Sequence, residues 1–474
     1  MAPLSLTTNA NGRITLDDAA VESLAASLRG DLLVAGTPGY DESRSIWNAM
    51  IDRRPGLIVE CLGAADVANA VRFAAEHDVV LSVRSGGHNI AGNAVCDGGV
   101  MISLARMTSV RVDPGARRAW VEPGNTLGDV DRETQAHGLA VPTGINSTTG
   151  IAGLTLGGGF GWLSRAHGMT VDNLVSADVV TAAGELVRAS AEENPDLFWA
   201  IRGGGGNFGI VTAFEFALHP IGPEVLAGLM VYPLADARDV LRHYREFCAQ
   251  APDELTVWAV MRKAPPLPFL PEDVHGTDVL VLATMFAGDM TDGELALAPL
   301  RTFGRAIADV IGPHPFIAFQ AAFDPLLTPG SRNYWKSHDF LALSDELIDT
   351  LLEYARTMPD PQCEVFIAQM GGATNRVPAD ATAYPHRDAE YIMNVHGRWD
   401  DPATDEQCIA WCRELFGAAA PHATGGVYVN FMTEEERERV PSAYGESLQR
   451  LREVKRVYDP GNLFRMNQNI LPAN

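Results

Sequence analysis

The segment that decides the fold is RSGGHN at residues 84–89, which follows the β-branched run VVLSV at residues 79–83. Two adjacent glycines after a strand pattern let successive backbone amides turn into one concavity. Such a concavity can bind a pyrophosphate without help from a lysine. We therefore expect this loop to hold a phosphate-bearing ligand.

Three more glycine-rich segments follow: PTGINSTTGIAGL (142–154), GGGFG (157–161) and RGGGGNFGIV (202–211). The last contains a G-x-G-x-x-G pattern at residues 204–209, but its surroundings read as helix, glycine turn, strand. A dinucleotide-binding unit requires strand, turn, helix, so the pattern does not indicate NAD. The sequence also lacks the P-loop pattern G-x-x-x-x-G-K-[ST]. Four glycine runs exceed what tight turns require, and they predict an extended ligand lying across this region.

The composition is that of a globular protein of about two domains, with 474 residues of which 46% are hydrophobic and 20% charged. Asp and Glu number 60 against 36 Lys and Arg, which gives a net charge of −24. This negative field disfavours nucleic acid and anionic membrane surfaces as partners. The six cysteines are scattered without disulfide or zinc spacing, so we expect no metal. No signal pattern or membrane-spanning apolar run is present, and a cytoplasmic protein is predicted.

The pattern of predicted strands and helices changes near residue 220 and again near residue 430. Residues 1–220 alternate short strand patterns with helices, and residues 176–190 predict a β-hairpin. Residues 221–430 carry longer strand patterns separated by helices, which predicts one antiparallel sheet backed by helices. The predicted fold class is therefore α+β.

Individual elements within these regions are also predicted. Helices are expected at residues 64–78 and 126–138, the second with Thr126 as its N-cap. The proline-rich segment 263–276 predicts a loop, because it suits neither the helical nor the strand period. Residues 434–458 predict one charged helix.

Several ordered motifs resemble a known family. RSGGHN, the TTGIAGLTLGGGFGWLSRAHG stretch and NPDLFWAIRGGGGNFGIVTAFEF are similar to the PCMH-type FAD-binding domain of the vanillyl-alcohol-oxidase flavoproteins. The ending VKRVYDPGNLFRMNQNI resembles the C-terminal signature of the berberine-bridge-enzyme-like branch, including bacterial members from secondary metabolism. The resemblance covers essentially the whole chain. It implies a two-part FAD domain, residues 1–220 and 431–474, with a substrate domain inserted at residues 221–430.

The resemblance also implies how FAD is held. His88 occupies the position of the histidine that bonds covalently to the 8α-methyl group of the flavin. As an alternative to contacting the flavin, Arg84 and Asn89 only position the loop. Likewise, Asn467 and Asn469 only cap the C-terminal segment. The flavin contacts implied are Arg84, Ser85, Gly86, Gly87, His88, Asn89, Pro142, Thr143, Gly144, Thr148, Gly150, Gly153, Leu154, Gly158, Gly161, Gly209, Ile210, Val211, Asn467 and Asn469.

Two positions depart from the family pattern. Many relatives bond the flavin a second time through the cysteine of G-[VI]-C-x-T-x-G, where this chain has Asn146. An amide cannot form the thioether, so a single covalent link is expected. Leu154 stands where many relatives have a histidine, and it leaves a drier patch compatible with a pocket for O2.

The resemblance places the substrate beneath the inserted sheet, so residues on three strand patterns, 363–372, 390–399 and 425–432, are candidates for catalysis. Glu364 is predicted as the base, Tyr428 as a hydroxyl partner and Asn394 as an orienting hydrogen-bonding group. Asn394 aligns with a Glu or Gln base of relatives, and Asn cannot abstract a proton. Glu364 alternatively lies solvated at the sheet edge, and Tyr428 alternatively fills the core.

His396 shares the face of Asn394, and Asn430 shares that of Tyr428. Trp47 is interpreted as a packing residue.

The resemblance implies an oxidase that transfers electrons from an alcohol, amine or phenol-like substrate to O2 and releases H2O2. Two alternatives within the enzyme class stay open: a flavin-oxygenating enzyme that rearranges a polyketide-like substrate, and a dehydrogenase with another acceptor. A flavin-binding or sensing module without turnover is the alternative from a different class. The substrate stays open, and a homodimer through an edge or face of the inserted sheet stays open as well.

Overall fold

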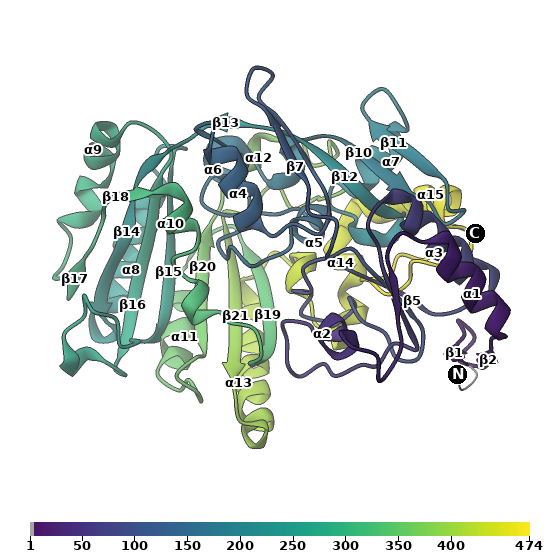
Figure 1. The fold of residues 1–474 in the computed structure, drawn as a ribbon. Coiled ribbons are helices and arrows are strands. Elements are labelled where there is room, and N and C mark those ends of the chain that lie inside the picture. Colours follow the sequence, from purple (N-terminus) through teal and green to yellow (C-terminus); the bar gives the residue numbers. More distant parts are fainter. Residues whose placement is uncertain (1–3) are drawn as a thin grey trace.

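Two small sheets from the first half of the chain form one half of the molecule in the computed structural model, which describes residues 4–474 (Figure 1). The four-stranded sheet has the order β3-β4-β6-β5, with β4, β6 and β5 parallel. The five-stranded sheet, β11-β10-β12-β8-β7, is antiparallel. Their strands are β3 (Asp31–Leu33), β4 (Leu57–Glu60), β5 (Leu81–Arg84), β6 (Val100–Ser103), β7 (Val110–Asp113), β8 (Arg118–Val121), β10 (Leu174–Val180), β11 (Leu186–Ser190) and β12 (Ile210–Ala217).

Helices and short pairings complete this half. The helices predicted at 64–78 and 126–138 are present as α3 (Ala64–Glu76) and α4 (Leu127–Gln135). Thr126 caps α4 and forms a capping box with Asp129, and β10 and β11 form the predicted hairpin. The other elements are β1 (Ser5–Thr7), β2 (Arg13–Thr15), α1 (Asp18–Ser27), α2 (Tyr40–Arg44), β9 (Leu139–Ala140), α5 (Ile151–Leu156), α6 (Ser164–His167), α7 (Pro195–Ile201) and β13 (His219–Pro220).

The large sheet of the other half has the order β17-β14-β16-β15-β20-β21-β19, with β18 beside β14, and all its pairings are antiparallel. This confirms the α+β fold class with an antiparallel sheet. The strand β19 was not predicted from the sequence. The strands are β14 (Glu224–Pro233), β15 (Leu255–Lys263), β16 (Asp278–Phe286), β17 (Ala308–Asp309), β18 (Gly312–Pro315), β19 (Arg332–Phe340), β20 (Glu364–Gln369) and β21 (Tyr391–Trp399).

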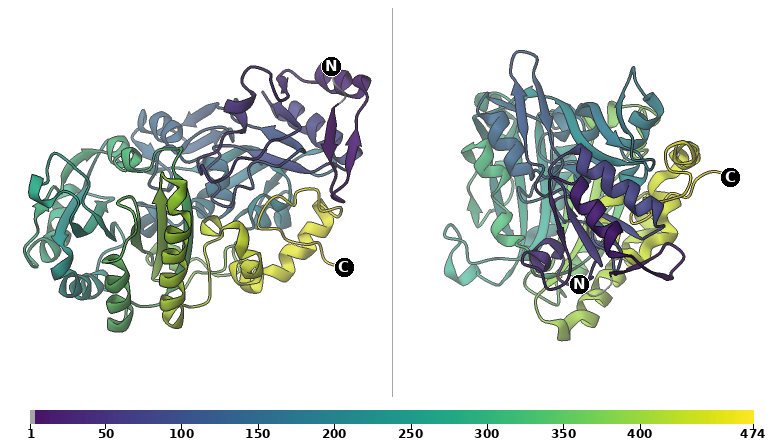
Figure 2. Two further views of the ribbon diagram at one scale, coloured as in Figure 1. Left: turned by 90° about the horizontal axis from the view of Figure 1, so that it is seen from below. Right: turned by 45° about the vertical axis from the view of Figure 1, so that its right-hand side comes forward.

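The two faces of this sheet have different partners. Side chains on one face pack against α8 (Ala237–Cys248), α11 (Asp345–Ala355) and α13 (Asp405–Ala419) in the largest apolar core of the molecule. The opposite face turns toward the first half of the molecule, as Figure 2 shows from below. Two further helices, α9 (Met290–Arg301) and α10 (Phe316–Gln320), lie beside β14.

Two sequence-based predictions of secondary structure were wrong. Residues 425–432 are not a strand but contain a 3-10 turn, Val429–Phe431, because β20 and β19 already pair with both edges of β21. The helix expected over 434–458 is interrupted just before Pro441, which lies in the first turn of α14 and lacks the backbone N–H that would continue a preceding helix, and again at Gly445, whose φ is +46°. Short helical turns, Glu434–Arg439, α14 (Val440–Tyr444) and Gly445–Ser447, precede α15 (Leu448–Tyr458).

The segment after residue 445 returns to the first half of the molecule, so both ends of the chain lie on the same side in Figure 1. There α15 packs against α7. Lys455, fully buried, pairs with Asp459 at 2.6 Å and donates to the carbonyl oxygen of Asn207 at 2.7 Å. Asp459 in turn accepts from the backbone amides of Leu463 and Phe464. This buried ion pair fixes residues 463–468 beside the glycine turn at 203–209.

Within residues 4–474, no helix is long and apolar enough to cross a membrane. The same residues contain no group of three or more His, Cys, Asp or Glu arranged to hold a metal ion. All six cysteines are buried free thiols, and Cys408 and Cys412 belong to the core beneath the large sheet.

Candidate active site

One continuous cavity separates the two halves of the molecule. Its first wall consists of the loops at 85–89, 144–154 and 205–211 together with residues 464–468. Its second wall is the inner face of the large sheet and the turn at 428–431. The site is thus assembled from segments far apart in the sequence, including the returning C-terminal segment.

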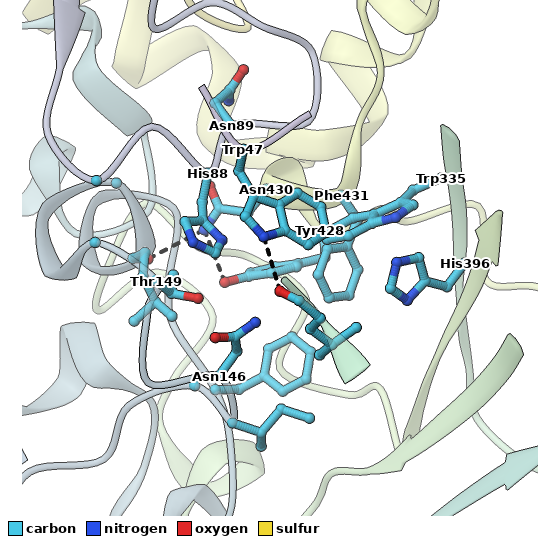
Figure 3. A pocket seen from close by; sticks show the side chains of 18 of the residues that line it. Trp47, His88, Asn89, Asn146, Thr149, Trp335, His396, Tyr428, Asn430 and Phe431 are labelled. Carbon is cyan, nitrogen blue, oxygen red and sulfur yellow. Dashed lines mark hydrogen bonds between the residues drawn. The ribbon is translucent and has the colours of Figure 1, made fainter. Parts of the chain in front are cut away.

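His88 lies at the centre of the first wall, on the loop that follows β5. The left-handed backbone of Gly87, with φ of +71°, turns the chain so that the His88 ring enters the cavity. The ring stacks on Trp47 with centroids 5.2 Å apart (Figure 3). Its Nε2 lies 3.1 Å from the hydroxyl of Thr148. Burial lowers the pKa of His88 to about 4, so at neutral pH the ring is uncharged and one nitrogen keeps a free lone pair.

The glycines around His88 make room for a ligand that is flat and long. A Cβ on Gly86 would lie 2.5 Å from the Cα of Gly150, so these two loops are in direct backbone contact. Gly153 lines the cavity, and a Cβ there would meet nothing within 4 Å. The indole N–H of Trp335, also at the cavity, finds no hydrogen-bond partner among residues 4–474. The open glycine floor fits the flat isoalloxazine and the phosphate groups of FAD.

The structure divides the predicted flavin contacts into two groups. The residues that line the cavity are Ser85, Gly86, Gly87, His88, Asn89, Gly144, Gly150, Gly153, Leu154, Gly209, Ile210, Val211 and Asn467. The residues outside its lining are Arg84, Pro142, Thr143, Thr148, Gly158, Gly161 and Asn469.

The predicted residues outside the lining support it from behind. Thr148 hydrogen-bonds His88, and Thr143 accepts a hydrogen bond from Gln320 at 3.2 Å. Gly161 is needed for close approach, because a Cβ there would lie 2.1 Å from the carbonyl oxygen of Thr143. Asn89 lies within the lining, but its side chain points away from His88 in Figure 3.

Asn146 lies on the same side of the pocket as His88 (Figure 3). Its side-chain oxygen accepts from the backbone amide of Thr148 at 3.0 Å and from the Thr148 hydroxyl at 2.7 Å. Thr148 therefore bridges Asn146 and His88. Asn146 thus helps to hold His88 in place through Thr148.

A row of polar side chains crosses the second wall. Trp335, His396, Glu364 and Arg262 are register partners on β19, β21, β20 and β15, so all four point to the same face. Glu364 pairs with Arg262 at 2.7 Å and faces Nδ1 of His396 at 3.2 Å. On its other side, Nε2 of His396 lies 3.3 Å from the side-chain oxygen of Asn333.

The electrostatics of this row assign different properties to Glu364 and His396. Burial alone would raise the pKa of Glu364, but Arg262 and His396 together lower it to about 2. A carboxylate held in this way is a weak base, which does not fit the predicted role of Glu364. Burial lowers the pKa of His396, with Glu364 opposing the shift, so the ring is uncharged at neutral pH. Both of its nitrogens face acceptor oxygens, which suits a group that takes up a proton.

Tyr428 contributes a hydrogen-bond donor. Its hydroxyl oxygen accepts from the backbone amide of Gly159 at 3.0 Å and from Asn430 at 2.9 Å, so the hydroxyl proton stays free. Burial raises the pKa of Tyr428 to about 12 and keeps the group neutral. Phe160 and Phe431 enclose its ring, each with a centroid distance of 4.9 Å.

Asn394 does not line the cavity. It lies two residues from His396 along β21, fully buried, and neither of its polar atoms has a partner within residues 4–474. Its register partner Phe366, on the neighbouring strand, does line the cavity. The structure therefore places Asn394 outside the lining of the cavity, and its orienting role stays a prediction.

Sequence reasoning missed several residues of the site. Trp47 was interpreted as packing, although its ring holds His88. Arg262 and Trp335 were not considered, although alternation along VWAVMR places Arg262 on the same face as Trp258. The strand at Arg332–Phe340 has a mixed polar pattern with no clean period of two, so Trp335 carried no comparable signal.

Comparison with known proteins agrees with this geometry. Residues 55–190 match the FAD binding domain family model, and residues 427–471 match the berberine and berberine-like model. An FAD-linked oxidoreductase of Bacillus subtilis is 33% identical over 455 residues, which cover 94% of this chain and 97% of the relative. (R)-6-hydroxynicotine oxidase of Paenarthrobacter nicotinovorans is 32% identical over 462 residues, again 94% and 97% of the two chains.

Solved structures extend the likeness to three dimensions. The crystal structure of 6-hydroxy-D-nicotine oxidase from Arthrobacter nicotinovorans superposes with a TM-score of 0.84 at 29% identity, covering 94% of this chain and 99% of the other. The BBE-like 1 protein of Physcomitrella patens has a TM-score of 0.86 at 24% identity, with 96% and 99% covered, and shows the shared fold.

Proposed function

The chain belongs to the berberine-like family of FAD-linked oxidoreductases, and from this premise we propose that it is an oxidase with FAD bonded covalently through His88 alone. The substrate is a small organic molecule, O2 is the electron acceptor and H2O2 is the product. The observation that carries the proposal is the position of an uncharged His88 in a glycine-lined cavity whose opposite wall bears His396, Glu364 and Tyr428.

The single tether is supported by the residues next to His88. A neutral imidazole has the lone pair that attack on the 8α carbon requires. Trp47 and Thr148 hold the ring from two sides and so restrict its orientation. Asn146 supplies no thiol for a second bond.

FAD, when bound, supplies the redox chemistry by accepting a hydride from the substrate. The residues of the second wall then handle the proton that leaves with it. We assign proton uptake to Nε2 of His396: in the uncharged ring, Nδ1–H donates to Glu364 and leaves Nε2 with the lone pair, and a proton gained there is then held by the side-chain oxygen of Asn333. Glu364 is a positioning residue that orients His396, and the Tyr428 hydroxyl donates a hydrogen bond to the substrate oxygen or nitrogen.

The acceptor distinguishes the proposal from its alternatives. Leu154 and Ala152 give the cavity an apolar patch on the flavin side, where a small neutral gas molecule can enter. A dehydrogenase would instead give turnover only with an added acceptor. A flavin-oxygenating enzyme would consume O2 without releasing an equal amount of H2O2.

The test has two steps. Acid precipitation followed by intact-mass measurement should give a yellow pellet with the mass of one FAD added, and His88→Ala should abolish both. Oxygen uptake and H2O2 release are then measured with alcohols, amines and phenols. 6-Hydroxynicotine and xylo-oligosaccharides belong in this set, because relatives are named for oxidising such compounds. A colourless pellet would refute the tether, and reduction by substrate without O2 uptake would refute the oxidase. The predicted homodimer and cytoplasmic location stay predictions.

A further inference from the structure

We propose that the cavity has a second compartment, an apolar arm, which binds a hydrocarbon tail of the substrate. The arm is lined by Leu229, Val231, Val260 and Val281 of the large sheet and by Leu267 and Leu270 of the proline-rich loop. The substrate class is therefore an uncharged molecule with a polar reacting end and an extended apolar segment. The placement of the reacting end rests on the proposed function.

The register of the large sheet places residues that line the arm in one row across neighbouring strands. Phe366, Val260, Val281 and Val231 are successive cross-strand partners on β20, β15, β16 and β14. Neighbouring strands lie about 4.8 Å apart, so this row extends roughly 14 Å from Phe366. Phe366 itself lies beside Phe431, with ring centroids 5.9 Å apart. The arm therefore begins next to the Tyr428 turn and leads away from it across the sheet.

The lining of the arm offers nothing to a polar ligand. Its side chains are aliphatic, and the strand backbones beneath them already pair with one another in the sheet. A sugar hydroxyl placed there would lose its hydrogen bonds to water without replacement. At the entrance, Arg262 is neutralised by Glu364 and is not free to hold an anion. Both features select a neutral, apolar chain.

The proline-rich loop forms the roof of the arm. The two ends of the loop are held together where Ala264 and Thr277 pair, with Ala264 N–H donating to Thr277 at 2.8 Å. A turn from Leu267 to Leu270, closed by a backbone hydrogen bond of 3.0 Å, directs both leucines toward the sheet. Leu270 is buried in a small apolar cluster with Val231. Phe269, which lies between Leu267 and Leu270 in the sequence, is partly exposed. The tail is thus enclosed from both sides.

The test titrates the flavin-loaded protein with straight-chain primary alcohols from butanol to decanol, with binding followed by calorimetry. Burial of a methylene group contributes about 0.8 kcal/mol, so each one that enters the arm should tighten binding about fourfold. Terminal diols of the same length should lose this gain, because their second hydroxyl would be buried without a partner. Xylo-oligosaccharides should bind no more tightly than the shortest alcohols.

Variants separate the arm from the rest of the site. Val281→Thr keeps the side-chain volume but adds a hydroxyl, and Leu267→Ser opens the roof. Each should weaken decanol binding about tenfold or more while butanol binding changes little. Leu295→Ser, on an exposed leucine of α9, is the matched control and should change neither. Should Val281→Thr fail to fold, Leu267→Ser on the loop still provides the comparison.

The two proposals fail in different ways. Affinities that do not depend on chain length, or that respond equally to Leu295→Ser and Leu267→Ser, would overturn the arm even if peroxide is produced. Length-dependent binding without any reduction of the flavin would support the arm and refute the oxidase.

Discussion

The indole of Trp47 stacks on the imidazole of His88, with ring centroids 5.2 Å apart and planes inclined by 20°. The indole N–H of Trp47 donates to the carbonyl oxygen of Leu327 at 3.1 Å. Leu327 belongs to the segment that precedes β19, so Trp47 connects the histidine of the first half to the large-sheet half of the molecule. The orientation of His88 therefore depends on the packing of both halves.

Trp47→Ala should slow the proposed covalent attachment of FAD to His88. Loss of the stacked ring removes about 1 kcal/mol of stacking energy that fixes the orientation of His88. The rate of flavin attachment should therefore fall roughly three- to tenfold. The measurement is the time course of acid-stable flavin after FAD is added to apoprotein. Trp47→Phe keeps an aromatic partner and should stay near the parent rate; equal rates for Ala and the parent would exclude this role.

Asn146→Cys should restore a second attachment point. In the His88→Ala background, a thiol at residue 146 would be the only cysteine among the described residues that line the cavity, and it lies on the same wall as residue 88. The double variant should retain acid-stable flavin, whereas His88→Ala with Asn146→Ser should release all of it. Absence of flavin from both pellets would show that residue 146 lies too far from the ring.

Much of this architecture could be predicted from local patterns. The glycine loops, the Thr126 cap, the hairpin at 176–190 and strands β20 and β21 carry periodic or turn signals within a few residues. The row Trp335–His396–Glu364–Arg262 could not, because its register depends on how four strands pair across more than 130 residues. The turn that presents Tyr428 was predicted as a strand, since alternation in GGVYVNFM does not reveal that both edges of β21 are occupied.

His396→Gln should lower the rate of anaerobic flavin reduction by a factor of about 10² to 10⁴, as expected for loss of a proton acceptor. Glu364→Gln should lower the rate of flavin reduction less than His396→Gln does, but it should shift the pH profile of that rate. The carboxylate of Glu364 raises the pKa of His396 against the effect of burial, so its neutralisation lowers that pKa. Because the base acts when uncharged, the rising limb of the profile should move to lower pH. An unmoved limb would show that His396 is not the titrating group.

Lys455→Met should destabilise the protein strongly. The variant leaves the Asp459 carboxylate fully buried without its cation, a change that costs about 3–5 kcal/mol in the free energy of unfolding. Chemical denaturation followed by tryptophan fluorescence measures the loss. Arg456→Met, on the next and exposed residue, is the control and should have little effect.

Asp131→Asn should change how stability depends on pH. Burial raises the pKa of Asp131 from 3.8 to about 7, although a hydrogen bond from Gln320 opposes the shift. Between these values the folded protein binds more protons than the unfolded chain, so the contribution of this group to stability falls as pH rises through this window and levels off above about 7. The melting temperature of the variant relative to the parent should therefore increase with pH across this window. A difference that is constant with pH would contradict the buried, protonated state.

Residues 464–468 form part of the cavity wall, so the cavity can be completed only at the end of translation. A ribosome completes the His88 loop early, but residues 464–468 of the same wall emerge only after nearly four hundred further residues have been translated. A nascent chain thus has no closed compartment in which to retain a flavin. Retention of FAD therefore depends on residues 464–468 as well as on the His88 loop.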